Sequence, residues 1–155
     1  GNSTLTDASV LSIAKNLKFL RSLNMSDCTA ATDESVHYLA QYSAPTLQIL
    51  CLVGMAKVRV SVLQELLQKC TQLVELSIEC DINKYGAEIV PHMGNLQQFV
   101  TYVLISDDTL CLIATHCTQM KRLSIMSAYT SSEGDATNVP VMYGIDKKSG
   151  VEGPF

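Results

Sequence analysis

The stretch Leu20-Arg21-Ser22-Leu23-Asn24-Met25-Ser26-Asp27-Cys28 decides the predicted fold. Its spacing, L-x-x-L-x-M-x-x-C, is typical of a short strand whose alternate side chains point toward a core. The cysteine falls where the chain turns after the strand, and it can satisfy backbone groups of the loop there. One such unit cannot bury its apolar side alone, so the pattern predicts neighbouring units of the same kind.

A helical pattern recurs between the strand-like segments. The first copy opens with Thr6-Asp7, a good helix-capping pair, and places apolar residues at i, i+3, i+4 and i+7. Close copies open at Thr32-Asp33 and at Ser106-Asp107. Two weaker copies cover residues 60–67 and 86–96, and Pro91 in the second predicts that this helix is short. The apolar positions of the first copy are Val10, Ile13, Ala14 and Leu17.

The strand-like and helical segments repeat with a nearly constant period. The first apolar strand position moves along the chain in steps of 27, 26, 26 and 21 residues. In the fourth unit, a strand frame that starts at Leu96 would place Thr101 in the core. The alternative frame, which turns Phe99, Tyr102 and Leu104 inward, is therefore preferred, and it predicts a short connection to the fifth helix. The first strand positions are then Leu20, Leu47, Leu73, Phe99 and Met120.

These units carry a Thr-Asp helix start, a cysteine near the helix end at Cys70 and Cys117, and a cysteine after the strand at Cys28. In this they resemble the cysteine-containing leucine-rich repeats of F-box proteins, over residues 5–127 and about five repeats. The resemblance implies a right-handed α/β solenoid, a horseshoe fragment with short parallel strands on its concave face and helices on its convex face. It also implies a protein–protein interaction module, the substrate-recognition region of an F-box-like ubiquitin-ligase subunit. The alternative is a leucine-rich-repeat scaffold or regulatory protein without a ligase role.

The composition changes near the end of the predicted array. Residues 1–127 are expected to form the repeat array, and residues 128–155 to form a C-terminal tail. The tail is rich in Ser, Thr, Gly and Asp but contains one apolar island at residues 139–145. The island either lies outside the repeats or adds a last strand that caps the array. Because the array opens on a helix without a preceding strand, we expect the chain to be part of a larger chain or complex.

Charge and cysteine usage narrow the function classes. A net charge of −4 argues against a general nucleic-acid or anionic-membrane partner, and no apolar run approaches the length of a membrane helix. The six cysteines contain no C-x-x-C pair and mostly fall on repeat positions, which indicates reduced thiols in a cytoplasmic or nuclear protein. A disulfide framework is the alternative.

Few residues carry a chemical motif. The three histidines lack ligand spacing, and no phosphate-binding glycine loop is present, so no metal or cofactor is expected and the chain is not predicted to be an enzyme. A cysteine-dependent enzyme acting through His116 and Cys117 is a distant alternative.

The candidate site is the concave face, onto which the side chains between the inward strand positions project. The second and fourth strands are expected to present apolar side chains there, with charged side chains on the third and fifth, which suits protein recognition. The alternative explanation is the β-propensity of a sheet that the tail partly covers. The predicted partner-binding residues are Ile49, Cys51, Val53, Glu75, Ser77, Glu79, Thr101, Val103, Ile105, Arg122 and Ser124.

Overall fold

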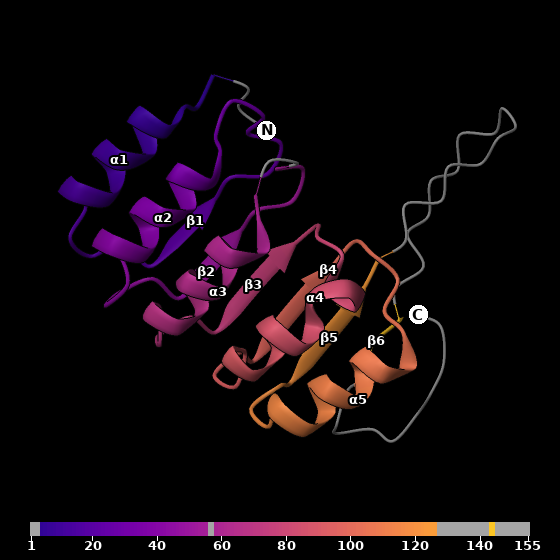
Figure 1. The fold of residues 1–155 in the computed structure, drawn as a ribbon. Helices are drawn as coiled ribbons and strands as arrows, with labels where there is room; N and C mark the ends of the chain where they lie inside the picture. Colours follow the sequence, from indigo (N-terminus) through magenta and orange to yellow (C-terminus); the bar gives the residue numbers. More distant parts are fainter. Residues whose placement is uncertain (1–3, 56–57, 127–142, 145–155) are drawn as a thin grey trace, which may run out of the picture.

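In the computed structural model, which describes residues 4–55, 58–126 and 143–144, helices and strands alternate along the chain (Figure 1). This part of the chain forms an α/β structure with five helices and a five-stranded parallel sheet, to which a sixth short strand is added. The elements are α1 (Asp7–Asn16), β1 (Ser22–Asn24), α2 (Asp33–Tyr42), β2 (Ile49–Cys51), α3 (Val60–Lys69), β3 (Glu75–Ile78), α4 (Ile82–Ile89), the 3₁₀ helix η1 (Val90–His92), β4 (Gln98–Thr101), α5 (Asp107–His116), β5 (Arg122–Ile125) and β6 (Tyr143–Gly144).

The strands follow one another across the sheet in chain order. β1 to β5 are parallel neighbours, and the helices lie side by side in the same order, with α1 at one end of the row (Figure 1). One row of paired side chains across the sheet is apolar and packs under the helices, with three of its members almost fully buried. The arrangement is compatible with a repeat solenoid, as the strand–helix pattern predicts. The row consists of Leu23, Leu50, Leu76, Phe99 and Leu123.

Aspartates at the starts of α1 and α2 tie each of these two helices to the next one. The Asp7 carboxylate accepts hydrogen bonds from the backbone N–H groups of Thr32 (2.8 Å) and Ser35 (3.1 Å) and from their hydroxyls, at 2.9 and 2.6 Å. Asp33 accepts in the same way from the backbone N–H of Arg59 at 2.6 Å, which caps α3, a helix without a capping side chain of its own. The first residues of α1 and α2 therefore satisfy free N–H groups at the starts of α2 and α3.

Replacing Asp7 by alanine is expected to lower the free energy of unfolding at pH 7 by about 2 kcal/mol, as for hydrogen bonds to a charged group. Partial burial raises the pKa of Asp7, but the hydrogen bonds from Ser35 and Thr32 outweigh it, so the pKa lies below its ordinary value of 3.8. A lowered pKa in the folded state stabilises the protein above the unfolded-state pKa, and this contribution is lost as the pH falls through the folded-state value. The difference between wild type and variant should therefore shrink below about pH 4.

Equilibrium urea unfolding at pH 7 and at pH 3 measures this difference. Asp107→Ala is the matched control, because Asp107 also opens a helix but is exposed and makes no hydrogen bond or ion pair within the described residues. Equal losses for the two variants at pH 7 would mean that the bonds of Asp7 to the next helix contribute nothing measurable.

The preferred strand frame of the fourth unit is wrong. Gln98 pairs with Glu75 and Phe99 with Leu76, so the frame starting at Leu96 is the one that forms. The inward positions are Leu96, Phe99 and Thr101, all buried, whereas Leu104, predicted to point inward, is 64% exposed. Thr101 is tolerated in the core because its hydroxyl accepts a hydrogen bond from the backbone N–H of Val103 at 3.3 Å. The paired strand positions now step by 27, 26, 23 and 24 residues.

The fourth helix is short, as Pro91 predicts, but it begins four residues before the predicted start at Gly86. It starts after Asp81, whose carboxylate accepts a hydrogen bond from the backbone N–H of Lys84 at 3.3 Å. Pro91 follows the helix, in a single 3₁₀ turn at residues 90–92.

Part of the predicted apolar island joins the sheet. Tyr143 and Gly144 pair antiparallel with Ile125 and Ser124, so the island adds a last strand at the edge beside β5. Its other residues, and most of the predicted tail, lie outside the described residues. No described helix is long and apolar enough to cross a membrane.

Candidate functional site

The side of the sheet turned away from the helices is the candidate site, and we call it the open face. Side chains alternate along each strand, so every second residue of β1 to β5 points to the open face. The strand register aligns these residues in two rows that run across all five strands. The first row is Ser22, Ile49, Glu75, Gln98 and Arg122, and the second is Asn24, Cys51, Ser77, Val100 and Ser124.

The first row combines one exposed apolar side chain with two opposite charges. Ile49 is 38% exposed, and it lies directly beside Glu75 on the next strand. Glu75 and Arg122 lie two strands apart, about 10 Å at the usual spacing between strands. Neither charged side chain has a hydrogen bond or an ion pair within the described residues. Both are therefore available to groups of a partner.

The second row is polar at one end and apolar near its middle. The Asn24 carboxamide oxygen accepts hydrogen bonds from the backbone N–H and hydroxyl of Ser26, at 2.9 and 2.7 Å. The Ser26 hydroxyl also contacts the sulfur of Cys51 at 3.0 Å. These polar groups are already satisfied by one another, which leaves Val100, partly exposed on β4, as an apolar contact on this row.

The loops beyond the strand ends hold Glu79 in place. Its carboxylate accepts a hydrogen bond from the backbone N–H of Gly54 at 3.1 Å. Gly54 has a φ of 76°, which favours glycine, and a Cβ atom at this position would also collide with the Asp27 carboxylate. Glu79 therefore supports a tight loop and is less free to meet a partner than Glu75.

The structure places eight of the eleven predicted residues on the open face or at its strand ends, from β2, β3 and β5. The other three belong to the wrong frame of the fourth unit. Thr101 points into the core and is fully buried, whereas Val103 and Ile105 follow β4 in the connection to α5. Ile105 is partly buried against the core and does not line the face.

Three residues that the sequence analysis missed take these places: Gln98, Val100 and, beyond the strand end, Tyr102. All three are partly exposed. The spacing of Leu96 and Phe99, which matches L-x-x-L, was the signal that would have found them. The polar side chain of Thr101 argues against this spacing, because it would place a hydroxyl in the core.

Three of the six cysteines are small core residues. All six are free thiols, and Cys28, Cys70 and Cys117 are buried. Burial raises the pKa of Cys117 to about 11 and that of Cys70 to about 12, the opposite of the lowered pKa that a nucleophilic thiol needs. The Nδ1 atom of His116 lies 3.0 Å from the carbonyl oxygen of Leu112 on its own helix. This geometry does not favour a cysteine–histidine catalytic pair.

The fold and the face together define a class of protein: an α/β chain whose parallel sheet is covered by helices on one side and presents mixed apolar and charged side chains on the other. Within the described residues, no group of three or more His, Cys, Asp or Glu side chains is arranged to hold a metal ion. No protein-family model matches the chain, and no curated protein sequence matches it significantly.

Proposed function

We propose that the chain is a segment of a leucine-rich-repeat solenoid that binds a protein partner through its open face. The observation that carries the proposal is the first row, in which exposed Ile49 stands beside the unpaired charge of Glu75, with the unpaired charge of Arg122 two strands beyond Glu75. An exposed apolar side chain surrounded by polar and charged groups is typical of protein recognition surfaces. In a solenoid the open face would be concave and would enclose an extended partner segment.

The row also indicates which chemistry the partner would carry. A basic side chain would meet Glu75, and an acidic one would meet Arg122, two strands away. Apolar side chains would contact Ile49 and Val100. Apolar contacts near the centre would supply most of the affinity, whereas the two charges would set orientation and association rate.

Charge reversal with Glu75→Lys should weaken partner binding at least tenfold, because like charges would then meet where opposite charges did. The fold should remain, because the Glu75 side chain is partly exposed and makes no hydrogen bond or ion pair within the described residues, and surface substitutions of this kind normally change stability by about 0.5 kcal/mol or less. The matched control is Glu88→Lys on α4, because Glu88 is exposed and makes no hydrogen bond or ion pair within the described residues. Glu65 is a poorer control, since it contacts His37 at 2.9 Å and Lys69 at 2.6 Å.

A photo-crosslinking residue at Ser77, in the second row, would identify the partner in cell extract, and the same residue at Ala87 on α4 would serve as the reference. Purified partner and chain would then give the dissociation constants of wild type and variants by calorimetry. A partner that crosslinks from Ala87 but not from Ser77, and that Glu88→Lys rather than Glu75→Lys releases, would place the binding surface on the helical side.

The specific role that we propose is substrate recognition in an F-box-like ubiquitin ligase of the cytoplasm or nucleus. The support for this is the cysteine-containing pattern of the units, together with the free state of all six thiols, which suits a reducing compartment. In this role the crosslinked partner should carry ubiquitin in cells, and excess chain should protect it from conjugation by competition. A partner whose ubiquitin conjugates do not respond to the chain would favour the scaffold or regulatory alternative.

A further inference from the structure

The outer side of α1 is an apolar surface that nothing covers within the described residues. Together with the segment that leads into β1, it forms what we call the end face, at the end of the row of helices in Figure 1. Leu17, which follows α1, is 51% exposed, whereas the residues that follow α2, α3 and α5 at the same position are each 2% exposed. Phe19 is 86% exposed. At Leu17 the end face thus exposes a position whose counterparts after the other helices are buried, and the exposed side chain of Phe19 follows two residues further along the chain.

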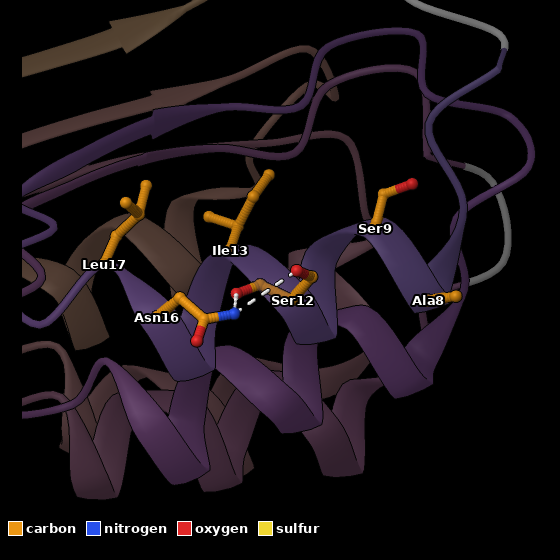
Figure 2. Close-up of a pocket in the computed structure, with 6 residues that line it drawn as sticks. All are labelled: Ala8, Ser9, Ser12, Ile13, Asn16 and Leu17. Atoms are coloured by element: carbon orange, nitrogen blue, oxygen red, sulfur yellow. Dashed lines mark hydrogen bonds between the residues drawn. The ribbon is translucent and has the colours of Figure 1, made fainter.

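Ile13 shows the same relation within the helix itself. It is the seventh residue of α1 and is only partly buried, whereas the seventh residues of α2, α3 and α5 are buried. Figure 2 shows Ser9, Ile13 and Leu17 pointing to the same side of α1, along a shallow open pocket. The counterparts of Ile13 are Leu39, Leu66 and Ile113.

A polar feature at the start of α1 adds to this apolar strip. Thr6 and Ser9 stand where Thr32 and Ser35 stand in α2, as the residue before the helix and the third helical residue. In α2 these groups donate four hydrogen bonds to the Asp7 carboxylate of the neighbouring helix. In α1 the Thr6 and Ser9 hydroxyls instead contact each other at 3.4 Å, and no described carboxylate reaches them.

The interface between α1 and α2 shows which side chains can pack against such a helix surface. On the α2 side of α1, Asp7 lies on the start of α2, and Val10 and Ala14, three and seven residues further on, are fully buried. The outer surface of α1 is the counterpart of the surface that α2 turns toward α1.

We propose that the end face binds a strand–helix unit of a partner segment whose helix begins with aspartate and continues with small apolar residues three and seven positions later. The aspartate carboxylate accepts hydrogen bonds from the backbone N–H groups and hydroxyls of Thr6 and Ser9. The apolar residues cover Ile13 and Leu17, and the strand of the unit lies beside β1. This surface is distinct from the open face and does not depend on the partner that the open face binds.

The first test extends the full chain by a second copy of residues 7–32, inserted between Thr6 and Asp7. Thr32 of the added copy then stands before α1 in place of Thr6, so the polar motif is kept, and the added Asp7 can reach it. The urea midpoint should rise relative to the natural chain. Leu17→Ala in the original α1 should lower the midpoint several-fold more in the extended chain than in the natural one, because Leu17 becomes buried only there.

Asp7→Ala in the added copy alone is the matched control, and it should remove part of the gain in midpoint. The proposal is overturned if the midpoint of the extended chain does not rise and Leu17→Ala has equal effects in both chains. The second measurement uses the natural chain and needs no extended chain to fold. A synthetic peptide of residues 7–32 should shift the methyl signals of Ile13 and Leu17 and the amide signal of Ser9 saturably, and the Asp7→Ala peptide should do so more weakly. Absence of any shift would overturn the proposal.

Two other occupants are outcomes of the same study. If the natural chain forms dimers whose mass by light scattering falls to that of the monomer with Leu17→Lys, the occupant is a second copy and the proposal fails. If the chain sediments with phosphatidylserine vesicles and Phe19→Asp abolishes this, the end face meets a lipid surface and the proposal also fails. A chain that stays monomeric and does not bind vesicles, but binds the peptide, supports the proposal.

Discussion

Replacing Phe99 by alanine is expected to lower the free energy of unfolding by about 3–5 kcal/mol, as for other buried phenylalanines. Phe99 is fully buried on β4, and it is paired with Leu76 on one side and Leu123 on the other. Its removal would take apolar area out of the core and leave a cavity between the sheet and the helices that cover it. Equilibrium urea unfolding followed by circular dichroism measures the loss.

Tyr102→Ala is the matched control for Phe99→Ala. The frame preferred from the sequence turns both aromatic residues inward, whereas the structure leaves Tyr102 partly exposed beyond the end of β4. The loss for Tyr102→Ala should therefore be much smaller. Similar large losses at both positions would mean that β4 is not in register with β3 as described.

Leu76→Ala is expected to have the second large effect, a loss of about 2–5 kcal/mol. Leu76 lies on β3, the middle strand of the parallel sheet, and is 1% exposed. Its strand neighbours, Leu50 and Phe99, are buried on both sides, so the surrounding core has little freedom to collapse into the space.

Ser77→Ala tests the opposite side of the same strand. Ser77 points to the open face and makes no side-chain hydrogen bond within the described residues, so the loss should be small. If the urea midpoints of Leu76→Ala and Ser77→Ala are equally and only slightly lowered, the side-chain alternation of β3 is reversed and the open face consists of other residues.

The fold could be predicted well where local pattern and burial agree. The Thr-Asp and Ser-Asp helix starts and the strand pattern around Leu23 correctly place α1, α2, α5, β1, β2, β3 and β5. The prediction failed in the fourth unit, because a hydrogen bond that satisfies the Thr101 hydroxyl in the core cannot be seen in the sequence. The polarity of Thr101 therefore argued for the wrong frame.

The open face shows the same division. Alternation along a strand correctly places Ile49, Glu75 and Arg122, because side-chain direction follows from the local backbone alone. Which residues lie opposite one another depends on loop lengths. The prediction therefore placed Thr101 and Val103 on the open face, where the register places Gln98 and Val100.

The sequence by itself determined the alternation of strands and helices, the apolar side of each, and the recurrence of aspartate at helix starts, because periodicity and capping are local properties of the chain. Only the tertiary structure decided the register of β4, the bonds from Asp7 to the next helix, and the exposure of Leu17. It also decided that the Thr6 and Ser9 hydroxyls contact each other rather than a carboxylate of the described residues. These depend on which elements become neighbours, and burial and hydrogen bonding between distant residues are decided when the elements pack.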